Sequence, residues 1–242
     1  MFEPSTLVMM AFILAFSAFL QGFSGFGMAL FAVPMMSAFG DLHTIVPLCL
    51  FASAFSTWLL LFLNHRAVHI RPLLPMVIAG AAGVPFGVYL IAHAPLSWTM
   101  RLLGMVILIV VAAQTLAKRN LIGSPTTAKS VIAGFLSGIL GGAFGTSGPP
   151  LVVYLHMTRD PKLARSALYF AFTVIGIISL AGHYRIGSFT HQVILSGLII
   201  MPAGMVGGKT GDWAAKRCAP EPFKKAVMAL LVLLGVSLLF RH

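Results

Sequence analysis

The chain has 242 residues, of which 59% are hydrophobic and only 9% are charged. Soluble globular domains carry about a quarter charged residues, so this composition excludes a soluble enzyme or binding module and indicates a polytopic membrane protein. Sixteen Lys and Arg against five Asp and Glu give a formal net charge of +11. We interpret this charge as basic cytoplasmic loops, and also as the source of a field that attracts anions. We expect no nucleic-acid partner. The two cysteines indicate neither a disulfide framework nor a metal site, and no cofactor is expected.

Two regions, 5–39 and 129–157, are each too long for one bilayer crossing of about 20 residues. A glycine-rich stretch interrupts each of them, GFSGFG at 22–27 and GILGGAFGTSGPP at 138–150. The pieces around these breaks include short ones of about ten to fourteen residues, closer to half the thickness of a membrane. Three clear spans follow each broken region, at 45–63, 72–92 and 98–117 and at 166–182, 191–208 and 226–240.

This order of elements repeats, once in residues 1–120 and once in residues 121–242. Residues 25–27 (GFG) match 143–145 (AFG) at a shift of 118, and Asp41 matches Asp160 at a shift of 119. We interpret the halves as N-terminal and C-terminal repeats of one integrated transmembrane domain.

The distribution of basic residues decides between two topologies. If each broken region crosses the membrane once, Lys and Arg divide seven to nine; if each enters and returns, they divide thirteen to three. The positive-inside rule favours the second. We therefore predict an all-α polytopic fold of two inverted repeats, each a broken or re-entrant helical hairpin plus three transmembrane helices, in the cytoplasmic (inner) membrane with both termini outside. Two closely spaced full crossings in place of each hairpin give the same sides and stay open as an alternative.

The glycine-rich breaks form the predicted binding site. Chain reversals inside a bilayer must be buried in protein or line a watery cavity, because unpaired backbone groups are costly in lipid. Pro149 and Pro150 suit the first turn of a returning helix, whose N-terminus favours an anion. Two inverted tips that meet near the midplane would enclose a polar pocket. The predicted substrate-binding residues are Gln21, Ser24, Gly25, Gly27, Gly142, Gly145, Thr146, Ser147 and Gly148. Isolated glycines such as Gly80, Gly83 and Gly134 are interpreted as sites of close helix packing.

Few groups could gate or couple transport. All five acidic residues lie near the N-terminus or at predicted loop edges, so no carboxylate is expected in mid-span. Asp41 and Asp160 are interpreted chiefly as helix N-caps, with a gating or ion-pair role involving Arg159 or Arg165 as the alternative. His156 is the first candidate for a proton-linked role, and we interpret His183 as an interfacial residue.

With these residues in place, the sequence resembles the TauE/SafE family of sulfite and organosulfonate exporters. GGAFGTSGPPLVVYL (141–155) is a close match to the glycine-rich motif of that family, GFSGFGMALFAVP (22–34) is a fair one, and the likeness covers nearly the whole chain. The resemblance implies transport of small sulfur oxyanions or related organic anions such as sulfoacetate. The first copy lacks a full glycine run, and Thr146 and Ser147 stand where the family often has glycines, so an anion other than sulfite stays open.

The predicted function is therefore export of a small anion through a midplane pocket between the two breaks. The membrane potential contributes about 2.3 kcal/mol per charge for each 100 mV, so export needs no coupling ion, although proton coupling stays open. An anion channel is the alternative, and a membrane-embedded enzyme is disfavoured because Ser147 has no basic partner nearby in sequence. The expected partners are the small anion and the lipid bilayer. The sequence leaves open which anion is carried, the direction and the coupling, and whether the unit is a monomer or a homodimer.

Overall fold

The computed structural model describes residues 2–25, 27–64, 70–118, 126–155, 161–217 and 220–240, and no strand lies among them. The helices are α1 (Pro4–Ser24), α2 (Ala29–Met36), α3 (Leu42–Asn64), α4 (Leu74–His93) after a single 3₁₀ turn η2 (Arg71–Leu73), α5 (Leu96–Lys118), α6 (Thr127–Phe144), α7 (Gly148–Leu155), α8 (Pro161–Arg185), α9 (His191–Ala215) and α10 (Pro220–Leu239). Six of them are long and apolar enough to cross a membrane, namely α1, α3, α4 with η2, α6, α8 and α9. The prediction of an all-α polytopic membrane protein is confirmed.

Each broken region consists of one long helix and one short helix. The 21 residues of α1 make a helix about 31 Å long, enough to cross a hydrocarbon core of about 30 Å, and α6 has 18 residues. Only α2 and α7, with eight residues each, are near half of that length. The expectation that the pieces include short ones is thus confirmed for the helices after the breaks, which are shorter than the ten to fourteen residues expected. The helices before the breaks are full length, and their apolar runs contain no proline after the first turn.

The two breaks begin with the same backbone turn. Gly25 and Gly145 follow the ends of α1 and α6 with φ of 80° and 67°, a left-handed conformation that costs other residues about 1–2 kcal/mol. Their N–H groups donate to the carbonyl oxygens of Gln21 (2.8 Å) and Gly141 (3.0 Å), which satisfies the last turn of each helix. Backbone geometry therefore pairs Gly25 with Gly145, whereas the match of sequence letters had paired Gly27 with Gly145.

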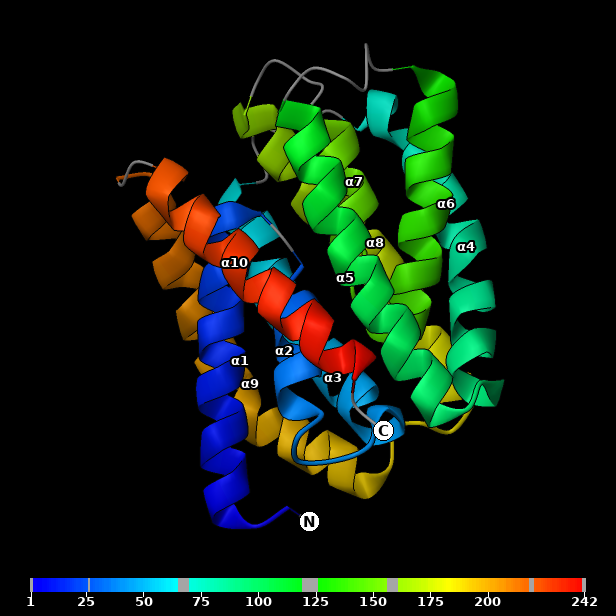
Figure 1. The fold of residues 1–242 in the computed structure, drawn as a ribbon, viewed down its shortest axis with the longest axis vertical. Helices are drawn as coiled ribbons and strands as arrows, with labels where there is room; N and C mark the ends of the chain where they lie inside the picture. The colour runs from blue at the N-terminus through cyan, green and yellow to red at the C-terminus, as the bar shows by residue number, and fades with distance from the viewer. Residues whose placement is uncertain are drawn as a thin grey trace.

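Two tightly packed helix pairs flank the bundle: α1 lies along α9 on one side, and α4 lies along α6 on the other (Figure 1). Glycines make these contacts close. A Cβ atom added to Gly134 or Gly83 would overlap backbone atoms of the facing helix, and one added to Gly80 would clash with the side chain of Ile175 on α8. The interpretation of Gly80, Gly83 and Gly134 as packing glycines is confirmed.

The contacts of one half recur in the other. The pair α1 and α9 corresponds to the pair α6 and α4, α2 packs on α10 as α7 packs on α5, and α3 and α8 pack on each other. Both chain ends lie toward the same end of the bundle (Figure 1). The inverted repeat stays a prediction, and this pattern of contacts supports it.

Candidate anion site between the helix breaks

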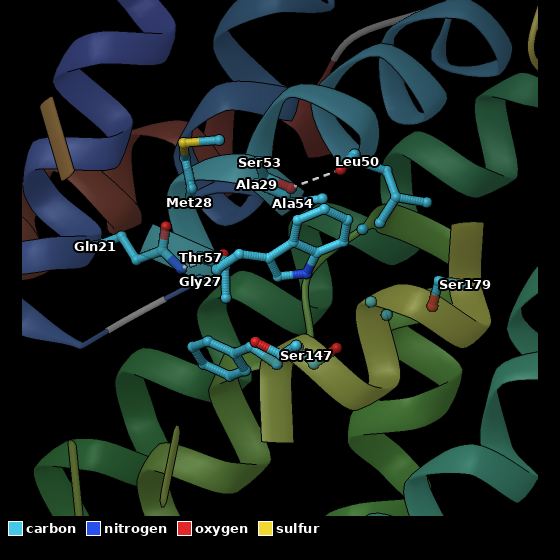
Figure 2. Close-up of a pocket in the computed structure, with 16 residues that line it drawn as sticks. Gln21, Gly27, Met28, Ala29, Leu50, Ser53, Ala54, Thr57, Ser147 and Ser179 are labelled. Atoms are coloured by element: carbon cyan, nitrogen blue, oxygen red, sulfur yellow. Dashed lines mark hydrogen bonds between the residues drawn. The ribbon is translucent and has the colours of Figure 1, made fainter. Parts of the chain in front are cut away.

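A small cavity of about 40 Å³ lies between the first break, which joins α1 to α2, and the second break, which joins α6 to α7. Ser53 and Thr173 line it and stand at the middle residues of α3 and α8. The cavity therefore lies at mid-depth in the bundle. Figure 2 shows Gln21 and Thr57 on one side of the cavity, with Ser147 and Ser179 across from them.

The two breaks touch each other without an intervening side chain. A Cβ atom added to Gly148 would lie 2.6 Å from the backbone nitrogen of Gly27, and one added to Gly27 would lie 3.1 Å from Thr146 Oγ1. The absence of side chains at Gly27 and Gly148 thus allows two chain segments far apart in sequence to meet beside the cavity.

The structure brings four of the predicted substrate-binding residues to the cavity wall: Gln21, Gly27, Gly145 and Ser147. Three more support the breaks from behind, because Gly25 makes the first turn, Gly148 touches Gly27, and Thr146 is fully buried with its Oγ1 toward Gly27.

Two predicted residues point elsewhere. The hydroxyl of Ser24 donates to the carbonyl oxygen of Leu20 (2.6 Å) in its own helix. Gly142 packs against the Val84 carbonyl of α4, so it serves helix packing, and its neighbour Gly141 lines the cavity instead.

Sequence reasoning missed the part of the wall that comes from α3 and α8. Its hydroxyl-bearing residues are Ser53, Thr57, Thr173 and Ser179, and the others are Leu50, Ala54, Trp58, Phe172 and Gly176. A signal was present, because hydroxyls three or four residues apart in an apolar helix share one face, and Ser53 and Thr57 have this spacing.

Several hydrogen-bonding groups at the cavity have no partner in the described part of the chain. The Gln21 side-chain nitrogen donates to Thr57 Oγ1 at 3.3 Å, but Gln21 Oε1 and Ser179 Oγ at the wall, and Thr146 Oγ1 behind it, are buried without a partner. Each such group costs about 1–3 kcal/mol, unless water or a polar ligand satisfies it. Unpartnered polar groups at mid-depth indicate a site that takes up a small polar species.

The short helices add their dipoles to this site. α7 begins at Gly148 and α2 at Ala29, and a helix N-terminus favours negative charge. Pro149 and Pro150 remove two of the N–H groups of α7, while the Leu30 N–H bonds back to the Gly27 carbonyl at 3.2 Å. Ser53 and Thr173 donate to backbone carbonyls of their own helices. The other hydroxyls at the wall and the remaining amides are therefore the donors. Among the residues that the structure describes, no charged side chain lines the cavity.

Of the predicted gating residues, the two that the structure describes, Asp41 and Arg165, do not line the cavity. Asp41 is an exposed N-cap of α3, with the Thr44 N–H donating to its Oδ1 at 3.2 Å, and this interpretation is confirmed. His156, Arg159 and Asp160 lie outside the described residues. Arg165 donates from one guanidinium nitrogen to the Phe23 carbonyl oxygen at 3.0 Å.

Asp212 was predicted to lie at the edge of a loop, but it lies within a helix and is buried. Its carboxylate is 4% exposed, inside α9, and lies 3.9 Å from Arg165 and 2.6 Å from Lys216. The helix runs on past the predicted end at Gly208 because Gly211 packs against the Phe19 carbonyl of α1. The fall in hydropathy at Lys209 therefore did not mark the end of the helix.

His183 is also placed differently from the prediction. It is 1% exposed rather than interfacial, and its Nε2 lies 2.8 Å from the Gly142 carbonyl oxygen. The Tyr169 hydroxyl makes a longer contact of 3.5 Å with the Gly22 carbonyl oxygen. One helix, α8, thus holds the end of α1 and the end of α6.

A larger hollow of about 480 Å³ lies between α5, α6 and α7, but nearly all of its lining side chains are apolar. It offers few donors to an anion. Among the described residues, no group of three or more His, Cys, Asp or Glu could hold a metal ion.

Comparison with known proteins adds independent information. A family model described as "Sulfite exporter TauE/SafE" matches residues 10–238. A curated protein of Cupriavidus necator named "Probable sulfite/organosulfonate exporter TauE" is 26% identical over 109 residues, which are 45% of this chain and 43% of that protein. This alignment thus spans less than half of the relative. No solved structure matches the chain.

Proposed function

We propose that this chain, which belongs to the sulfite exporter TauE/SafE family, is a membrane transporter that exports small sulfur-containing anions through the cavity between its two helix breaks. The family match covers residues 10–238, and the described helices are those of a multi-pass membrane protein. Sulfite, sulfoacetate and related organosulfonates are the substrate class, because the name of the related protein mentions sulfite and organosulfonates.

The single observation that carries the proposal is the polar cavity at mid-depth. Its volume is about 40 Å³, while one water requires about 10–15 Å³ on such a measure. The cavity thus accommodates about three water-sized groups, which suits an oxyanion of a few heavy atoms. A larger organosulfonate would need the two breaks to move apart.

The neutral lining suits transport rather than storage. Hydroxyls, amides and helix dipoles stabilise an anion, and a site without a fixed cation can release it again. Export from the cytoplasm gains about 2.3 kcal/mol per charge for each 100 mV of membrane potential. We propose export across the cytoplasmic (inner) membrane, with both termini outside, driven by the potential, and proton coupling is the alternative drive.

Flux measurements on the purified chain in proteoliposomes test this function. We expect saturable uptake or release of sulfite that follows an imposed potential, with competition by sulfate, thiosulfate, sulfoacetate and taurine ranking the substrates. Ser179→Ala should weaken transport, because Ser179 Oγ is buried at the wall. Ser237→Ala is the matched control, because Ser237 bonds within α10 and is exposed. Flux that does not saturate with anion concentration would indicate an anion channel. Absence of any anion flux would reject the proposal.

A further inference from the structure

Within the described residues, Arg165 uses little of its hydrogen-bonding capacity. One nitrogen of its guanidinium donates to the Phe23 carbonyl oxygen at 3.0 Å. The other terminal nitrogen is 3.9 Å from Asp212 Oδ1, beyond the range of a hydrogen bond, and Asp212 Oδ1 has no hydrogen-bond partner in the described part of the chain. The side chain of Arg165 is 27% exposed. A reachable guanidinium edge therefore forms a long ion pair with a carboxylate but no hydrogen bond to it.

The carboxylate is already neutralised from another direction. Lys216, one turn further along α9, holds Asp212 Oδ2 at 2.6 Å. Asp212 is buried, whereas Lys216 is 56% exposed. The three side chains carry a net charge of +1, so the cluster is attractive to an anion that approaches from outside the bundle.

The position of this cluster relates it to the cavity. Phe23 is two residues from Gln21 in α1, and Arg165 precedes Phe172 by seven residues in α8, about 10 Å along the helix; both Gln21 and Phe172 line the cavity. Arg165 lies near the start of α8, and α8 begins at the end of the bundle away from the start of α1 (Figure 1). The predicted topology assigns that end to the cytoplasm.

We propose that Arg165 is a second oxyanion site, an entry site where the transported anion docks before it reaches the cavity, and that Asp212 is the internal carboxylate with which it competes. This inference rests on the proposed function. A guanidinium presents paired donors in a plane that matches two oxygens of an oxyanion. The incoming anion takes the unfilled edge without breaking a formed hydrogen bond to Asp212. Repulsion from Asp212 keeps the affinity low, which lets the anion move on.

Sulfite transport measured separately from each face of oriented membrane vesicles tests the entry site. Arg165→Gln should raise KM about tenfold or more at the face that carries Arg165, because a hydrogen-bonded charge is lost there, and should leave KM at the opposite face unchanged. Arg165→Lys should give a smaller rise, since it keeps the charge and loses the planar fork. Asp212→Asn should lower KM at the Arg165 face, because it removes the competitor.

Lys209→Gln is the matched control, since it removes one positive charge from an exposed position of the same helix as Asp212. If it raises KM as much as Arg165→Gln does, the effect arises from the overall positive charge of the protein, and the entry site is rejected. Equal changes at both faces, or a rise of KM in Asp212→Asn, would also overturn the inference. Should Arg165→Gln not fold, Arg165→Lys and Asp212→Asn decide alone. If the wild-type chain transports sulfite and the variants leave KM unchanged at both faces, only the entry site is refuted. If the wild-type chain shows no flux, the proposed function is refuted.

Discussion

The first and second helix breaks begin with the same backbone turn but carry different side chains. Each follows a long apolar helix, turns at a glycine with positive φ and continues into an eight-residue helix. At the cavity, the first break contributes the long amide side chain of Gln21, whereas the second contributes Gly141 and the short hydroxyl of Ser147. The common backbone places two helix N-termini beside one cavity, and the different side chains make the two halves of that cavity chemically distinct.

The breaks also differ in what holds them to α8. The end of α1 is held through the Arg165 guanidinium, which belongs to an ionic cluster with Asp212. The end of α6 is held by the imidazole of His183, which bonds to the Gly142 carbonyl oxygen. We infer that the first break responds to an anion that arrives at the Arg165 face, whereas the second break forms a rigid wall of the cavity.

The largest effect is expected where the breaks touch. Gly148→Ala would place a Cβ atom 2.6 Å from the Gly27 nitrogen, and because backbone cannot move aside cheaply, sulfite flux in proteoliposomes should fall by about tenfold or more. Gly27→Ala should be milder, since the nearest atom is the Thr146 hydroxyl at 3.1 Å. Gly40→Ala, whose nearest neighbour would be Ile45 at an ordinary 3.5 Å, is the control. Full flux in Gly148→Ala would show that the breaks need not touch.

The two sides of the cavity can be compared through substrate affinity. Ser147→Ala removes a hydroxyl from the second break, and a hydrogen bond to a charged ligand contributes about 1.5–3 kcal/mol, so the KM for sulfite should rise roughly tenfold to a hundredfold. Gln21→Leu should act similarly if the first break contributes equally. Ligand-induced thermal stabilisation of the purified variants gives an independent measure of affinity. Unchanged affinity in a folded Ser147→Ala chain would remove the second break from the binding site.

Sequence alone predicts the helical architecture well, because spans and breaks are local properties of composition. The glycines and prolines that interrupt residues 5–39 and 129–157 mark both breaks. Contacts between helices are harder, since they depend on which face of one span meets another. Gly142 and Gly141 illustrate this, because adjacent residues in one glycine run point to α4 and to the cavity. Asp212 was misplaced because helix packing, not hydropathy, determines where α9 ends.

A moderate effect on stability is expected at His183. His183→Leu leaves the buried Gly142 carbonyl oxygen without its side-chain partner, which costs about 1–3 kcal/mol and should lower the thermal unfolding temperature in detergent. If the second break is only a fixed wall, KM at either face stays unchanged in the protein that remains folded. His183→Gln is the control that keeps a donor. A change of KM at one face only would mean that the second break, like the first, takes part in the anion route.

The smallest effect is expected at the two turn glycines, where the backbones of the breaks are most alike. Gly25→Ala and Gly145→Ala each put a Cβ atom on a residue with positive φ, and should each destabilise the fold by about 1–2 kcal/mol. Neighbours at 3.3 Å or more, all side-chain atoms, add little to this cost. Asn at either position should be tolerated better than Ala, because Asn enters the left-handed region more readily. Unfolding temperatures that fall equally for the two Ala variants indicate equivalent turns, whereas a much larger fall at one position would show that the second turn is not a structural copy of the first.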